Sequence, residues 1–485
     1  MYRRFLLVIL GVIITPSVWV LNAPTLRGED INIAASTTRS VKGLKLKVSA
    51  NGRYLVSQDG KPFLYLGDTA WTLFKRLTRE EAEEYLKNRA AKGFTVIQAY
   101  VLRGLEVKNI YGDLTVLDRD PTKPNEAFFK NVDYIVDRAN QLGLVMGMVV
   151  TYGEHVGGTT EPAFHPSNAF AYGEFLGSRY KGNAVIWLLG GDRQAAGAEE
   201  IWAAMAKGLK AGSKGTQLVS YHSGGPRQGV TAYSSSFWFH NAEWLDFNMI
   251  QSGHRWGTLN YEFITHDYDL KPVKPTIDME ARYENHPDVG RHTAERMDAH
   301  QEREAAYWNM LAGAAGHGYG NNNIWQFWDP DRMPALDDHS FPFAALRGTT
   351  HWRKAMDFEG AYDMGLLRKL FEVRPWYRMI PDQSLIALGK DEGEDHIQAA
   401  RADDSSFIVA YLPFGHRVGI HMDKLSAPGI KAQWYDPREG TWTYIGQYTN
   451  SGIREFVPPS NGDQNDWVLV LEDKSRNYPT ELPGQ

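Results

Sequence analysis

Two carboxylic acids follow apolar runs in this sequence. Asp192 comes after Val185–Leu189 and two glycines, Gly190 and Gly191, and Glu280 comes after a second apolar run. A pair of carboxyl groups can hydrolyse a glycosidic bond, because one protonates the leaving oxygen while the other attacks the anomeric carbon or activates a water. We therefore interpret Asp192 as the acid and Glu280 as the ionised nucleophile. The sequence does not give their separation, so retaining and inverting reactions both stay open.

Each carboxylate also has a simpler interpretation. An aspartate after two glycines is a common turn residue or helix cap, and Glu280 could pair with Arg282 across a loop. If Asp192 is the acid, an apolar wall that includes Trp187 should favour its protonated form. The two glycines would then let the backbone approach a ligand closely, because they carry no Cβ atom.

Other polar and aromatic residues at predicted strand ends are candidates for binding a substrate. They are Asp68, Trp71, Gln98, Tyr152, His222, Gln251 and Trp325. Asp68 could instead brace the end of the fold, and the tryptophans could be core residues. Histidines at three strand ends suggest a metal, but no HxH or HExxH spacing occurs, so we expect no metal and no cofactor.

The elements that must position these residues alternate between two types. Apolar runs that are interrupted by helical patterns are typical of parallel strands buried on both faces. Eight such units predict a (β/α)8 TIM barrel, in which the carboxyl ends of the strands form one mouth. An open doubly wound sheet is the alternative, but GDTAW after the first run is not a glycine-rich phosphate loop. The predicted strands are 63–71, 94–102, 144–153, 184–192, 217–224, 247–253, 275–284 and 318–328.

Helices are predicted at 77–93, 126–143, 168–183, 198–215 and about 292–315. In the first of them Thr78 can act as the N-cap and Glu81 stands at the capping-box position. The charged stretch 295–304 predicts a solvated face on the barrel exterior.

The two ends of the chain differ from this barrel, which we assign to residues 46–385. Residues 386–475 alternate apolar and polar positions with turn signals, which predicts a small antiparallel β-sandwich. Residues 1–23 combine two arginines with an apolar run and predict a signal peptide, hence a secreted or periplasmic protein. Pro24 is unfavourable after a cleavage site, so a retained anchor is the alternative, although we expect no stable membrane span. Residues 24–45 are polar and aperiodic, as in a linker.

Composition narrows the class of partner. The chain has 485 residues, 43% of them hydrophobic, and a net charge of −6, without the basic stripe typical of nucleic-acid binding. It has no cysteine, which excludes disulfides, thiolate chemistry and a lipoprotein anchor. Its 15 Trp and 24 Tyr suit stacking on sugars as well as core packing. We therefore consider a carbohydrate partner and expect no nucleic acid.

Three segments resemble glycoside hydrolase family 140, the apiosidase-like family of secreted bacterial enzymes. They are the stretch from NGRYLVSQDGKPFLYLGDTAW to FTVIQ, the turn WLLGGDR and the strand KPTIDMEARYE. The resemblance covers about residues 45 to 475. It implies a barrel followed by a β-sandwich that carries a collagen-binding label, with Asp192 as acid/base and Glu280 as nucleophile. It further implies a retaining endo-apiosidase whose partner is a plant cell-wall polysaccharide, with D-apiose linkages in the side chains of the pectin rhamnogalacturonan II as the bonds that it cleaves.

Two other functions remain to be distinguished from this one. A non-catalytic carbohydrate- or matrix-binding protein would use the C-terminal module and exposed aromatic residues, of which Trp434 and Trp442 are the first candidates. A barrel glycosidase of different sugar specificity would use the same two carboxylates. We expect the β-sandwich to pack on the barrel and to shield apolar surface, and not to bind collagen.

Overall fold

A computed structural model describes residues 39–158, 161–226, 232–288, 295–332, 346–389 and 392–482. The predicted signal peptide and most of the predicted linker therefore lie outside the described residues. Within the described ranges, no helix is both long and apolar enough to cross a membrane.

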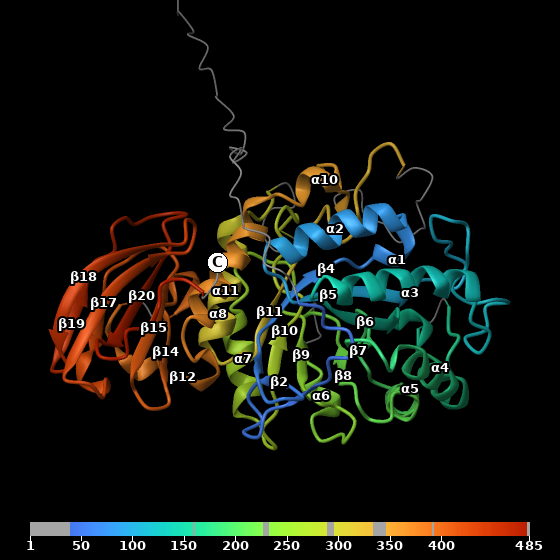
Figure 1. Cartoon of the computed structure of the whole chain (residues 1–485), viewed down its shortest axis with the longest axis horizontal. Coiled ribbons are helices and arrows are strands. Elements are labelled where there is room, and N and C mark those ends of the chain that lie inside the picture. The colour runs from blue at the N-terminus through green and yellow to red at the C-terminus, as the bar shows by residue number, and fades with distance from the viewer. Residues whose placement is uncertain are drawn as a thin grey trace, which may run out of the picture. The chain divides into compact units, whose positions relative to one another are not determined.

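Eight parallel strands form the central sheet, as predicted (Figure 1). The first and the eighth of them pair with each other, and the fifth and sixth, at the ends of the hydrogen-bonded order, are joined by a bond from Ser220 Oγ to the carbonyl of Phe247 at 2.7 Å. This arrangement is a barrel and not an open doubly wound sheet. The strands are β4 (Tyr65–Thr69), β5 (Val96–Leu102), β6 (Val145–Thr151), β7 (Val185–Gly190), β8 (Val219–His222), β9 (Asn248–Ile250), β10 (Thr276–Asp278) and β11 (Gly316–Tyr319).

All five predicted helices are present. The predicted capping box is confirmed, because the Thr78 hydroxyl accepts from the backbone N–H of Glu81 while the Glu81 carboxylate accepts from that of Thr78. The helices around the barrel are α1 (Leu73–Arg76), α2 (Arg79–Ala91), α3 (Glu126–Gln141), α4 (Pro166–Tyr180), α5 (Glu199–Ser213), α6 (Ser236–Phe239), α7 (Asn260–Asp269) and α8 (Ala299–Leu311), followed by α10 (Trp352–Ala355) and α11 (Glu359–Glu372).

The eighth strand is shorter and earlier than predicted. β11 ends at Tyr319, and the rest of the predicted strand forms turns. The carboxamide oxygen of Asn321 accepts from the backbone N–H of Asn323 at 2.9 Å, the local bond by which asparagine favours turns over strands. Trp325 therefore lies in a turn beyond the strand.

A small antiparallel sheet precedes the barrel in the chain. It consists of β1 (Leu46–Val48), β2 (Leu55–Ser57) and β3 (Pro62–Phe63). Leu46 and Leu55 pack into the same cluster as residues at the amino ends of the barrel strands, such as Val145 and Leu218. The sheet therefore covers the end of the barrel opposite to the mouth.

The C-terminal domain is the predicted antiparallel β-sandwich, drawn in orange to red in Figure 1. Trp434 is buried in its core, so our expectation of an exposed aromatic at this position is wrong. Trp442 is half-buried and packs on Tyr435, with ring centroids 4.8 Å apart. One sheet has the order β12 (Met379–Pro381), β14 (Gln398–Ala402), β15 (Phe407–Leu412), β20 (Trp467–Asp473), β17 (Gly429–Asp436) and β18 (Thr441–Thr449), and the other β13 (Ile386–Leu388), β16 (Val418–His421) and β19 (Ile453–Phe456).

The charged stretch 295–304 does not form a solvated face. Every residue of α8 is buried, and Arg303 donates to Asp363 of α11 at 2.8 Å and to Asp466, just before β20, at 2.9 Å. Glu304 accepts from Arg282 at 2.5 Å. The prediction failed because the C-terminal domain packs on this helix, so its charges find partners inside the protein and not in water.

We expect Arg303→Met to lower the free energy of unfolding by about 3–5 kcal/mol, because two buried carboxylates lose the cation between them. Denaturant unfolding followed by tryptophan fluorescence measures the change. Arg476, which is half-exposed and 3.4 Å from Asp404, is the matched control, and Arg476→Met should change stability by less than about 1 kcal/mol. Equal, small effects of the two substitutions would show that the buried network is dispensable.

Candidate active site

Asp192 is presented by a sharp turn at the end of β7. Gly190, Gly191 and Asp192 all have positive φ, at 87°, 96° and 59°, a region that glycine adopts freely and aspartate tolerates. A Cβ atom on Gly190 would lie 2.0 Å from the carbonyl oxygen of His222, and one on Gly191 would lie 2.8 Å from that of Thr151. The glycines therefore allow close approach to the neighbouring strands β8 and β6, and not to a ligand as we expected.

Two neutral groups hold the half-buried Asp192 side chain. The amide of Gln251 donates to Oδ1 at 3.1 Å and the hydroxyl of Tyr100 donates to Oδ2 at 3.4 Å. Trp187 does not form the expected wall, because it faces the surrounding helices, donates to Gln217 at 2.8 Å and packs on Tyr180. The aromatic neighbour of the carboxylate is Tyr100.

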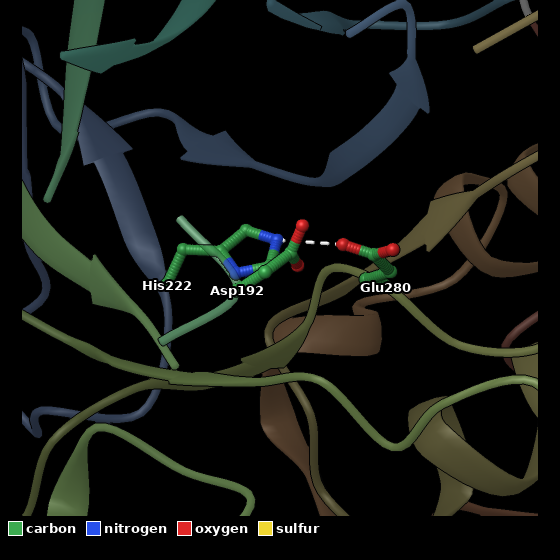
Figure 2. Close-up of side chains that lie close together, drawn as sticks. All are labelled: Asp192, His222 and Glu280. Carbon is green, nitrogen blue, oxygen red and sulfur yellow. Dashed lines mark hydrogen bonds and ion pairs between the residues drawn. The ribbon is translucent and has the colours of Figure 1, made fainter. Parts of the chain in front are cut away.

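Glu280 follows β10 and is buried, with both of its oxygens accepting hydrogen bonds. His222 Nε2 donates to Oε2 at 2.7 Å, which Figure 2 shows as a dashed line, and His254 Nε2 donates to Oε1 at 3.2 Å. Glu280 does not pair with Arg282, which binds Glu304 instead. The side chain that we interpret as the nucleophile is thus held by two imidazoles.

The electrostatics of this pair favour the charged forms. Burial alone would raise the pKa of Glu280, but the hydrogen bonds and charges of His222 and His254 hold that pKa well below its usual range. Burial alone would lower the pKa of His222, yet the hydrogen bond and charge of Glu280, with the charge of Asp192, raise it to about 9. At neutral pH Glu280 is therefore a carboxylate and His222 an imidazolium, which also donates from Nδ1 to the carbonyl of Ser223 at 2.9 Å.

The two carboxylates converge across the barrel mouth. One oxygen of Asp192, one oxygen of Glu280 and one nitrogen of His222 all lie within 4.8 Å of one another (Figure 2). Such a set could hold a divalent cation, with one ligand atom from each of the three residues. The same arrangement, two carboxyl groups facing each other across a short gap, suits an acid and a nucleophile.

Four of the predicted binding residues lie around this centre in addition to His222. Trp71 faces the His222 ring edge-on at 5.4 Å and donates to the hydroxyl of Tyr283 at 2.9 Å. Gln251 binds Asp192 as described above, and Tyr152 packs edge-on against Tyr100 at 6.0 Å. Gln98 lies deeper, where its amide donates to the carbonyl of Met279 at 3.1 Å.

Asp68 and Trp325 make other contacts. Asp68 faces α2, where it accepts from Tyr85 at 2.6 Å and from Arg89, so it braces the barrel. Trp325 packs on the cluster that contains Trp71 and donates to the side chain of Asn322 at 3.1 Å. The contacts of Asp68 agree with the bracing alternative, and both positions stay predictions as binding residues.

Sequence reasoning missed Tyr100 and Tyr283, and it placed His254 at a strand end without linking it to Glu280. Tyr100 stands two residues after Gln98 in the same strand, and this spacing places both side chains on the interior face. That signal could have identified Tyr100. No comparable pattern marks Tyr283 or pairs His254 with Glu280, because their contacts depend on how the loops after β9 and β10 pack.

We expect the stability that His222 contributes to vanish in alkali. Its folded pKa of about 9 exceeds its ordinary value of 6.5, so the contribution is complete below pH 6.5 and is lost as the pH rises through 9. His222→Gln should therefore cost up to about 3 kcal/mol at pH 6 and much less at pH 10, as measured by denaturant unfolding. The half-exposed His416 is the control, and His416→Gln should have little effect at either pH. A loss for His222→Gln that does not vary with pH would contradict this linkage.

Comparison with known proteins agrees with this geometry. The model of the apiosidase-like catalytic domain family matches residues 49–378, and a model named for the collagen-binding domain of a collagenase matches residues 380–472. No curated protein matches the chain at a significant level.

Two solved structures resemble nearly the whole chain. One, described as a glycoside hydrolase, is 33% identical, with 91% of this chain and 100% of the other covered at a TM-score of 0.81. The second, described as a family 5 glycoside hydrolase from Bacteroides vulgatus ATCC 8482, is 31% identical, with 92% and 98% covered at a TM-score of 0.82. The chain therefore belongs to the apiosidase-like family and is a glycoside hydrolase.

Proposed function

We propose that this glycoside hydrolase is a retaining endo-apiosidase of family 140 that cleaves D-apiose linkages in the side chains of rhamnogalacturonan II. The observation that carries the retaining assignment is the approach of an Asp192 oxygen to within 4.8 Å of a Glu280 oxygen. Retaining enzymes place their two carboxyl groups about 5–5.5 Å apart, and inverting enzymes about 6.5–9.5 Å apart. The sugar is inferred from the family match and from the sequence resemblance.

In the first step a Glu280 oxygen attacks the anomeric carbon while the bond to the leaving oxygen breaks. Asp192 gives its proton to that oxygen, and a glycosyl ester of Glu280 forms. The hydrogen bonds from His222 and His254 keep Glu280 ionised and orient it before the attack. They also lower its basicity, which makes it a better leaving group in the second step.

In the second step Asp192, now a carboxylate, takes a proton from a water. The water oxygen attacks the anomeric carbon, the ester bond to Glu280 breaks, and the second inversion restores the original configuration. Gln251 and Tyr100 donate to the two oxygens of Asp192 and hold it in place through both steps.

The C-terminal domain supports the barrel in this proposal and does not bind collagen. Arg374 is the second residue after α11. Its guanidinium donates to Glu472 of β20 at 2.8 Å, and this ion pair is buried. A second buried link runs from Arg303 of α8 to Asp466. We also propose that the enzyme is secreted or periplasmic, because the apolar run at residues 5–20 follows two arginines as in a signal peptide.

We expect Asp192→Asn and Glu280→Gln each to lower kcat/KM by at least about 100-fold, because each removes a group that acts on the reacting atoms. Reducing-end release from rhamnogalacturonan II fragments is the assay, and thermal unfolding checks that both variants fold. Glu455, an exposed carboxylate of β19, is the control, and Glu455→Gln should retain full activity. Near-normal turnover in either active-site variant would remove that residue from its role.

The anomeric configuration of the first product tests the mechanism separately. We expect proton NMR of a fresh digest to show the configuration of the substrate, because two inversions cancel. An inverted first product would mean that Glu280 activates a water instead. A panel of pectic and hemicellulosic polysaccharides tests the sugar, and glycan binding without any product would favour the binding-protein alternative.

A further inference from the structure

We propose that a hollow beside the two carboxylates is a subsite for the carboxylate group of an acidic sugar, with Arg103 as its main ligand. The inference rests on the proposed function, because it takes the substrate to be a glycan held between Asp192 and Glu280. It assigns to Arg103 and Asn109 a part in selecting the substrate, which the proposed function leaves without residues.

The hollow adjoins the reacting centre through two shared walls. It is narrow and open to solvent, and Trp71, Tyr100 and Arg103 are among the residues that line it. Trp71 also packs edge-on against His222, and the hydroxyl of Tyr100 binds Asp192. A group in the hollow would therefore belong to a sugar at, or next to, the bond that is cleaved.

The lining of the hollow is positively charged. Arg103 is half-buried with its guanidinium 4.0 Å from the ring centroid of Tyr152 and 5.4 Å from that of Tyr100. Among the described residues it forms no ion pair with a carboxylate, so its N–H groups can serve a ligand. The buried Lys75 of α1 also lines the hollow, and none of its lining residues among those that the structure describes is acidic.

An amide without a partner stands at the same hollow. The side-chain oxygen of Asn109 accepts from the backbone N–H groups of Tyr111 and Asp113, at 3.0 and 2.9 Å. Its side-chain nitrogen is buried and has no hydrogen-bond partner among the residues that the structure describes. Unpaired buried donors are uncommon in native proteins, and this one indicates a position where a ligand accepts.

These donors match a planar anion attached to a sugar ring. The guanidinium fork pairs with both oxygens of a carboxylate, and stacking on Tyr152 holds the fork in one plane. In a uronic acid the carboxylate projects from the ring on a single bond. We therefore expect the sugar ring to lie beside Trp71 and Tyr100, the walls that the hollow shares with the reacting centre, while its carboxylate meets Arg103.

The first experiment compares an acidic pectic substrate with the same material after chemical reduction of its carboxyl groups. We expect wild-type kcat/KM to fall about 10- to 100-fold on reduction, which is the loss of one charge-assisted pairing. In Arg103→Gln the ratio of kcat/KM on the native substrate to kcat/KM on the reduced substrate should fall toward one. In Arg103→Lys the ratio should be intermediate. Arg454, stacked on Tyr448 at 3.9 Å in the C-terminal domain, is the matched control, and Arg454→Gln should keep the wild-type preference.

The second experiment measures binding alone and so does not depend on turnover. Galacturonate trisaccharide should bind the wild type by calorimetry at least about 10-fold more tightly than its carboxyl-reduced form, and Arg103→Gln should lose the difference. Equal binding and equal turnover of the two forms would overturn the acidic subsite while leaving the glycosidase intact. Selective uronate binding without cleavage of any pectic substrate would uphold the subsite and refute the proposed function.

Discussion

A carboxylate buried at the mouth of this barrel keeps its charge only because two imidazoles donate to it. Burial opposes the ionised form of Glu280, and the hydrogen bonds from His222 and His254 outweigh that opposition. The same pairing holds His222 as a cation, so each group maintains the charge of the other. The site is thus a preorganised ion pair, and it faces Asp192 across a gap of a few ångströms.

The opposite side of the gap is built by different means. Asp192 stands on a turn of three residues with positive φ, and the two glycines of that turn fit against the backbones of β6 and β8. Its neighbours, Gln251 and Tyr100, are neutral donors. The His222 cation lies within 4.8 Å of both carboxylates, but it donates a hydrogen bond to Glu280, which also accepts one from His254. The two carboxylates thus differ in their hydrogen-bond donors, and such a difference in environment is how an acid and a nucleophile are told apart.

The C-terminal domain contributes to the barrel through charge as well as apolar packing. α8 has the composition of a surface helix, yet it lies between the barrel and the β-sandwich, and Arg303 is shared by Asp363 and Asp466. A charged sequence is compatible with burial when each charge meets a partner. This arrangement gives the domain a structural role that its family name does not describe.

The sequence by itself determined the order of strands and helices, the capping box at Thr78 and the place of Asp192 and Glu280 at strand ends. These features follow from local backbone preferences and from apolar periodicity, which neighbouring residues set. Only the tertiary structure decided how close the two carboxylates lie and which donors hold them, since those contacts join strands far apart in the chain. The same reason explains the misjudged surface of α8, whose charges are buried because the packing of the C-terminal domain decides their partners.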